Sequence, residues 1–177
     1  MKSLCVAAAA LLLAACATPG FLFPAAEVEF ELSGRIAVKY GDDAGSGNIA
    51  WRHGLRSDEM LLTSPFGQGI ARLVRKGDEV TLTAQDGREF RAADAESLTE
   101  QVLGFRVPLR GLADWVRGRP AVAPAPTRQR NDASGRLAGF EQSGWRIEYL
   151  EYEGALPSRL KLNFPGLELR LAVSEWK

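Results

Sequence analysis

The sequence predicts a mainly β protein of the α+β class, in which two helices are inserted into one curled antiparallel sheet. Apolar and polar residues alternate along long segments near both ends of the chain, as in strands with one buried and one solvated face. Turn signals recur between shorter β-favouring runs, which indicates an antiparallel meander. Helical spacing appears in the segment from about residue 94 to residue 118.

The first residues are expected to be a lipoprotein signal. Lys2 precedes an apolar run, Leu4 to Leu13, that is too short to span a bilayer, and Leu13-Ala14-Ala15-Cys16 follows. This tetrapeptide has the form of a bacterial lipobox, which is cleaved before the cysteine, so Cys16 is the predicted lipidation site. An ordinary signal peptide that happens to contain a cysteine is the alternative. Residue 17 is Ala, not the Asp of an inner-membrane retention signal, which favours the outer membrane.

The chain therefore divides into three parts: a signal peptide (1–15), a lipidated N-terminus and tether (16–26) and a single domain (27–177). The tether has prolines, a glycine and no periodicity. Cys5 leaves with the signal and Cys16 carries lipid, so we expect neither a disulfide nor a thiol site in the domain. The formal net charge is +0, and the absence of a basic field argues against nucleic acid as a partner.

The first predicted strand, residues 27–40, has apolar residues at its even positions, interrupted only by Gly34. Gly34 would let this long strand bend, as a curling sheet requires. A turn is expected at 41–47 and another at 55–58, and Asp86-Gly87 is a strong hairpin signal. The strands predicted around these turns are 48–53, 59–63, 70–74, 79–85 and 88–92.

Two helices are expected next. The first runs from the N-cap candidate Asp94 to Gly104, and the second starts at Pro108 and carries an apolar stripe that ends before Gly118. Residues 120–132 are rich in proline and alanine, so we expect an exposed, mobile connection there. The strands predicted after it are 135–142, 145–152, 158–164 and 167–176.

The apolar stripes of the helices must cover an apolar surface, and the inner face or open mouth of the sheet is the candidate. Either the helices close a ligand cavity or they complete an ordinary core. The sequence does not decide between these two readings, because a cavity requires a sheet that its own side chains do not fill.

The residues offer little catalytic chemistry. His53 is the one histidine, and we interpret it as a surface or satisfied strand-end residue, since no second histidine or available cysteine would complete a metal site. No G-x-S-x-G turn presents a serine. Gly67-Gln68-Gly69 begins like a dinucleotide motif, but Arg72 replaces its third glycine, and no phosphate-binding P-loop occurs. We expect no enzyme activity, no metal and no cofactor.

Phe66 is an unusual residue for its position. Pro65 and Gly67 place it at the tip of a hairpin turn, where side chains normally face water and are polar. The ring is expected either to project from the loop or to fold back onto the helices.

Taken together, the lipobox, SGRIAV, SGNIAW, LLTSPFGQG, DAESLTEQVLG and LADWVRGRP occur in an order that resembles the LolB family of outer-membrane lipoprotein receptors. The resemblance covers residues 27–177. It implies an incomplete antiparallel β-barrel, capped by an α-helical lid (about 94–118) over an apolar cavity that holds acyl chains.

The resemblance also implies a function and partners. The protein would receive acylated lipoproteins from the periplasmic carrier LolA and insert them into the inner leaflet of the outer membrane, without nucleotide. It would face the periplasm as a lipid-anchored monomer. Related proteins carry an exposed apolar loop residue, often Leu, that is linked to membrane delivery, and Phe66 occupies that position here. The proline-rich stretch 120–126 departs from the family pattern.

The predicted cavity lining combines inward strand residues with the apolar stripes of the helices. It comprises Phe30, Leu32, Ile36, Val38, Trp51, Met60, Leu62, Leu98, Val102, Leu112, Trp115, Val116, Leu160 and Leu162. Two alternatives from other classes remain. One is a structural lipid-anchored scaffold with a filled core, and the other is a lipocalin-like binder of free fatty acids or other small hydrophobes.

Overall fold

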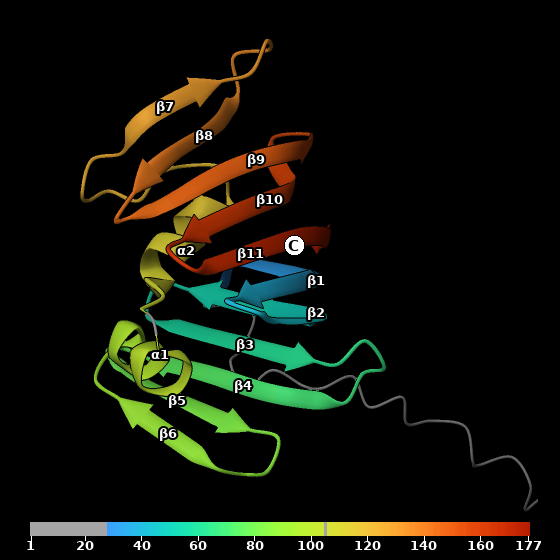
Figure 1. Cartoon of the computed structure of the whole chain (residues 1–177), viewed down its shortest axis with the longest axis vertical. Coiled ribbons are helices and arrows are strands. Elements are labelled where there is room, and N and C mark those ends of the chain that lie inside the picture. Colours follow the sequence, from blue (N-terminus) through green and yellow to red (C-terminus); the bar gives the residue numbers. More distant parts are fainter. Residues whose placement is uncertain (1–27, 105) are drawn as a thin grey trace, which may run out of the picture.

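A computed structural model of the chain describes residues 28–104 and 106–177. Its strands are β1 (Val28–Tyr40), β2 (Asp43–Gly54), β3 (Ser57–Thr63), β4 (Gly69–Lys76), β5 (Glu79–Ala84), β6 (Glu89–Ala92), β7 (Thr127–Asn131), β8 (Leu137–Gln142), β9 (Trp145–Glu153), β10 (Leu156–Phe164) and β11 (Leu167–Trp176). They form an 11-stranded antiparallel sheet in the order β6-β5-β4-β3-β2-β1-β11-β10-β9-β8-β7 (Figure 1). The sheet is open, with β6 and β7 at its edges.

The predicted mainly β class and the two inserted helices are confirmed. The order of the strands reflects two meanders, β1–β6 before the helices in the sequence and β7–β11 after them. The two meanders meet where β1 pairs with β11. At this junction the register shifts between Ser33 and Gly34, and a Cβ on Gly34 would collide with the backbone carbonyl of Ala172. The predicted irregularity at Gly34 therefore has a physical cause, which is the close approach of β11.

Three expectations about turns and loops were wrong. The turn expected at 55–58 is shorter, because Ser57 and Asp58 belong to β3 and Asp58 pairs with His53 of β2. Residues 43–47 belong to β2 and pair with β1, which leaves Gly41 and Asp42 as the turn. Residues 127–131 form β7 and pair with β8, so only the first part of the 120–132 connection is a loop. In all three places pairing with a neighbouring strand supplies backbone hydrogen bonds that outweigh the weak β propensity of the sequence.

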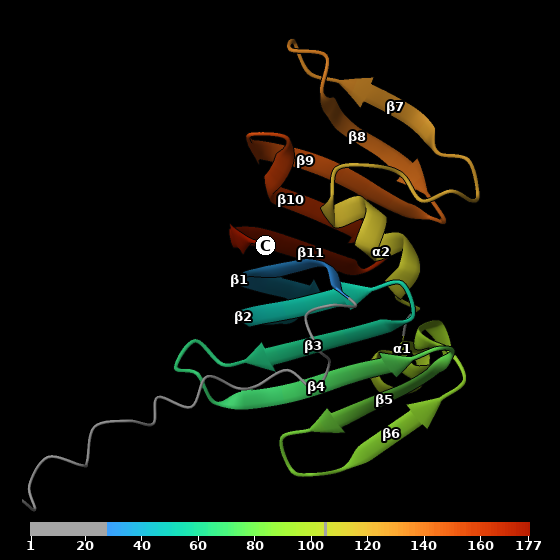
Figure 2. The same cartoon turned by 180° about the vertical axis from the view of Figure 1, so that it is seen from behind.

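The helices are α1 (Ala95–Leu103) and α2 (Leu109–Val116). Asp94 caps α1 by accepting a hydrogen bond from the backbone N–H of Ser97 at 2.6 Å, and Gly104 ends the helix in the left-handed region, as predicted. Pro108 is the residue before α2 rather than its first residue. α1 lies against β5 and β6, and Figures 1 and 2 show α2 beside the ends of β10 and β11.

One apolar cluster forms the core between the helices and the sheet. Leu98 of α1 and Trp115 and Val116 of α2 are at most 1% exposed, as are Leu32 and Trp51 of the sheet. Of the fourteen residues predicted to face inward, nine are buried and the other five are partly buried against the same cluster. The strand faces inferred from alternation are therefore the faces that the structure buries.

Candidate functional site: the Phe66 loop and the core beneath the helices

The β3–β4 loop is a tight turn held by its own hydrogen bonds. The N–H of Gly67 donates to the carbonyl of Ser64 at 2.9 Å, so Pro65 and Phe66 are the central residues of a β-turn. The Ser64 hydroxyl accepts from the N–H groups of Phe66 (3.3 Å) and Gln68 (3.2 Å). Gly67 has φ +87°, which glycine adopts without steric cost. These contacts hold the loop in one defined conformation.

The Phe66 side chain is 95% exposed. It therefore does not fold back onto the helices. Figures 1 and 2 both show the β3–β4 loop projecting from the side of the molecule away from α1 and α2. Asn48 of β2 fixes the base of the loop by donating to the Ser64 carbonyl at 3.0 Å. A large apolar ring is thus exposed to solvent on a loop whose conformation is held by hydrogen bonds.

The core beneath α2 is filled by large side chains. The rings of Trp115 and Trp145 lie 6.0 Å apart between centroids, and Trp145 lies 5.1 Å from Phe164. The hydroxyl of Tyr149 donates to the carbonyl of Trp115 at 2.7 Å. Burial raises the pKa of Tyr149 well above its ordinary value, with smaller contributions from Tyr152 and Asp114. In this conformation all fourteen predicted lining residues belong to one buried apolar cluster or pack against it.

Gln142, at the end of β8, links α2 to the loop that follows it. Its side-chain oxygen accepts from Trp115 Nε1 at 2.7 Å and from the N–H of Ala121 at 2.9 Å. Its amide nitrogen donates to the carbonyls of Ala121 (2.8 Å) and Pro124 (2.5 Å). Gln142 is only 3% exposed. The local sequence FEQSG does not predict these contacts, because nothing in it distinguishes Gln142 from a solvated glutamine.

A second buried polar cluster lies where β2 meets β3. Asp58, 1% exposed, accepts from Trp51 Nε1 at 2.8 Å and from Arg75 Nε at 2.5 Å. His53 Nδ1 lies 2.6 Å from the same carboxylate. His53 is therefore a satisfied, buried strand-end histidine. The buried ion pair was missed, because Asp58 falls within the segment expected to be a turn.

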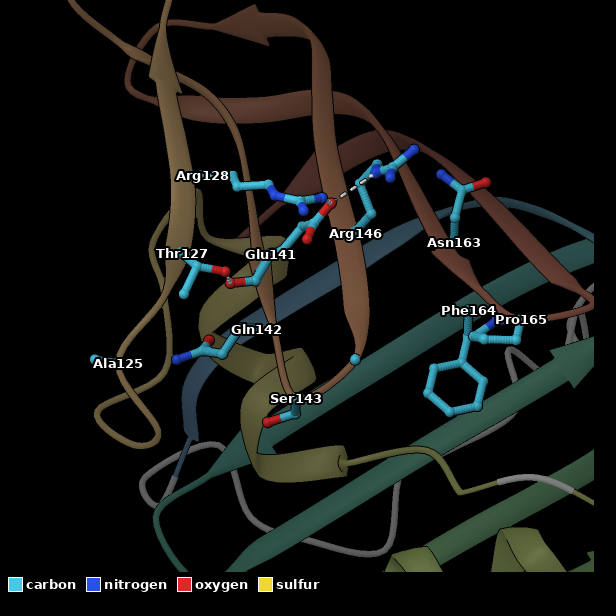
Figure 3. Close-up of a pocket in the computed structure, with 11 residues that line it drawn as sticks. Ala125, Thr127, Arg128, Glu141, Gln142, Ser143, Arg146, Asn163, Phe164 and Pro165 are labelled. Carbon is cyan, nitrogen blue, oxygen red and sulfur yellow. Dashed lines mark hydrogen bonds and ion pairs between the residues drawn. The ribbon is translucent and has the colours of Figure 1, made fainter.

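The structure also has a polar hollow of about 450 Å³ at the β8–β9 turn, bordered by β7 and β10 (Figure 3). Glu141 bridges Arg128 (3.0 Å) and Arg146 (3.1 Å) inside it. The hydrogen bond from Arg146, followed by that from Arg128, lowers the pKa of Glu141. None of the fourteen predicted lining residues borders this hollow, and its compensated charges do not suit an acyl chain.

Within residues 28–104 and 106–177, no group of histidine, cysteine and carboxylate side chains is placed to hold a metal ion. No helix in the same part of the chain is long and apolar enough to cross a membrane. The predicted signal and the lipidation site Cys16 lie outside the described residues.

The fold is shared with a solved structure. A LolA superfamily protein of Nitrosomonas europaea aligns with a TM-score of 0.51 and 12% sequence identity, covering 88% of this chain and 87% of that chain. At this identity the likeness concerns the fold alone. The fold is therefore LolA-like: an open antiparallel sheet with two helices packed on it.

The sequence comparisons define the family. A family model described as outer membrane lipoprotein LolB matches residues 28–176. The outer-membrane lipoprotein LolB of Azoarcus sp. (strain BH72) is 37% identical over 185 residues, covering 98% of this chain and 92% of the relative. The protein of the same name from Thiobacillus denitrificans is 41% identical over 150 residues, covering 82% and 78%. The chain belongs to the outer membrane lipoprotein LolB family.

Proposed function

We propose that this protein is a lipid-anchored receptor of the outer membrane that accepts acylated lipoproteins from the carrier LolA and inserts them into the inner leaflet. In this proposal Cys16 carries the anchor, and the core beneath α1 and α2 opens to hold acyl chains. The observation that carries the proposal is the 95% exposed Phe66, held on a hydrogen-bonded loop in a member of this family.

Acyl chains in water explain why such a receptor is needed. Burying each CH₂ gains about 0.8 kcal/mol, so exposing the several chains of one lipoprotein would cost on the order of tens of kcal/mol. The chains must therefore pass from one apolar site to the next. The sequence contains no nucleotide-binding motif, so direction would come from increasing affinity along the series carrier, receptor and bilayer.

Acyl chains need space that the core does not offer in this conformation, because Trp115 and Leu98 fill it with at most 1% exposure. We infer that α2 moves away from the sheet when cargo enters. The polar contacts that resist this movement are the bond from Trp115 Nε1 to Gln142 and the bond from Tyr149 to the Trp115 carbonyl. The displaced apolar surfaces would contact the acyl chains, which would replace the lost core contacts.

Phe66 acts at the last step in this proposal. Moving a phenylalanine side chain from water into an apolar environment is favourable by roughly 1.5–3 kcal/mol. Insertion of the ring would hold the receptor against the bilayer and perturb lipid packing where the acyl chains leave.

The test separates acceptance from delivery. Carrier loaded with a triacylated lipoprotein is mixed with the receptor, first alone and then with phospholipid vesicles, and an unacylated lipoprotein serves as control. Phe66→Glu is compared with wild type and with Leu55→Glu, which changes an 80% exposed side chain on the β2–β3 turn.

Phe66→Glu is expected to accept cargo normally and to deliver it at least about tenfold more slowly, as the loss of the ring's insertion energy requires. Leu55→Glu should match wild type in both steps. Equal delivery by all three proteins would refute the role of Phe66.

The filled core favours one competing function, that of a structural lipid-anchored scaffold. The same assay distinguishes it, because a scaffold would take no lipoprotein from the carrier whether or not the cargo is acylated.

A further inference from the structure

The face of the sheet opposite the core, called here the outer face, has a hollow of about 380 Å³ beside the Phe66 loop. Arg35 of β1, Arg159 of β10 and Arg170 of β11 line it, and these residues alternate with buried or partly buried core positions. Pro65, which precedes Phe66, also borders the hollow. The hollow thus joins the exposed loop to three arginines from three adjacent strands.

The charged side chains that line this hollow are all arginines, whereas the adjoining hollow, which shares Arg35 and Arg159, is also lined by Glu151 and Glu153. Among the described residues that border the hollow beside the Phe66 loop, three are arginines and none is Asp or Glu. Arg35 is exposed and forms no ion pair with any residue that the structure describes. Arg170 pairs with Glu168 at 2.7 Å, and that carboxylate also contacts Lys161. Arg159 pairs with Glu151 at 3.3 Å, where both side chains are more than half exposed. An exposed pair such as Arg159–Glu151 exchanges partners at little cost.

Apolar side chains flank these charges. Phe66 projects from one side, and Leu150 of β9, which is 59% exposed, borders the other. Figures 1 and 2 show that the β3–β4 loop and the β9–β10 turn project toward the same side of the molecule. Exposed apolar groups beside arginines match the boundary between the acyl chains and the phosphates of a phospholipid layer.

We propose that the outer face around Arg35 lies against the membrane and binds the phosphates of anionic phospholipids while Phe66 inserts beside them. Arginine suits this role because its guanidinium group forms paired hydrogen bonds to phosphate oxygens. This orientation leaves α1 and α2, which pack on the opposite face, directed toward the periplasm, where the carrier arrives. The inference rests on the proposed function in one respect, the contact of Phe66 with the membrane.

The experiment measures vesicle partition of residues 16–177 in which Cys16→Ser removes the acyl anchor. Vesicles of phosphatidylethanolamine with phosphatidylglycerol are compared with vesicles of phosphatidylcholine. Arg35→Gln is compared with Arg35→Lys, which keeps the charge, and with Arg91→Gln, a matched change of an exposed arginine on β6. Phe66→Ser reports on the loop separately, and urea melts establish that each variant is folded.

Arg35→Gln is expected to weaken partition into the anionic vesicles about fivefold, the effect of one basic residue at such a surface. Arg35→Lys should retain most of the binding, and Arg91→Gln should retain all of it. Binding to phosphatidylcholine should depend on Phe66 and little on Arg35. At about 1 M salt, where the Debye length falls to about 3 Å, the difference between wild type and Arg35→Gln should disappear.

Equal partition of Arg35→Gln and Arg91→Gln would overturn the inference. If Phe66→Ser still weakened binding in that case, the proposed role of the loop would stand. A loss of acceptance from the carrier without vesicles, combined with normal partition of Arg35→Gln, would also overturn it, because the face would then dock the carrier.

Discussion

Replacing Gln142 with leucine tests whether this side chain holds α2 and the following loop on the sheet. The substitution keeps an apolar group of similar size at the end of β8 but removes four hydrogen bonds. Trp115 is only 1% exposed, and its Nε1–H would lose its acceptor. The N–H and carbonyl of Ala121, which is partly buried, would also lose their partner.

The expected cost follows from where these groups lie. An unsatisfied buried donor costs about 1–3 kcal/mol, and each partly exposed hydrogen bond contributes about 0.5–1.5 kcal/mol. Pro124 is exposed, so water can replace the bond to its carbonyl. The free energy of unfolding should fall by roughly 2–5 kcal/mol, most of it from Trp115 and Ala121. For a domain of this size the Tm should fall by roughly 5–15 °C.

The assay is urea unfolding followed by tryptophan fluorescence, with Gln129→Leu as control because Gln129 is exposed on the neighbouring strand β7. Binding of an apolar fluorescent dye below the unfolding transition reports on the core. If Gln142 restrains α2, Gln142→Leu should bind more dye than the control. A loss of stability no larger than that of Gln129→Leu, without added dye binding, would refute the reasoning.

Two further predictions concern buried polar groups. Because burial raises the pKa of Tyr149, folding keeps its hydroxyl neutral, so its contribution to stability is fully present below the unfolded pKa of about 10 and is lost as the pH rises above it. The free energy of unfolding measured from about pH 8 to 11 should decline, and the decline should be smaller in Tyr149→Phe. At neutral pH the same variant should lose about 1 kcal/mol through the missing bond to Trp115. Identical declines in the two proteins would contradict this assignment. Asp58→Ala should cost roughly 3–5 kcal/mol because it leaves Arg75 buried without its carboxylate, and Asp58→Ala/Arg75→Met should be less destabilised than the sum of the single variants. Additive effects in that double-mutant cycle would show that the pair is not coupled.

The parts of the fold that were predicted correctly are those with a local signal. Period-two alternation identified the buried face of β1, and Asp94 and Gly104 delimited α1. The turn at Pro65 and Gly67 predicted that Phe66 sits at a loop tip, and the structure shows its ring in solvent. Where local propensity and pairing disagreed, at residues 43–47 and 127–131, pairing with the adjacent strand decided the outcome.

The sequence by itself determined the mainly β class, the inward residues of β1, β2, β3 and β10, the two helices and the family to which the chain belongs. Only the tertiary structure decided which side chains from distant segments meet. Gln142 reaches Trp115 across 27 positions of the chain, and Arg35 shares a hollow with Arg159 and Arg170 because β1 pairs with β11. Alternation depends on neighbours two residues apart, whereas these meetings depend on strand order, which is set by the joint burial of the whole core.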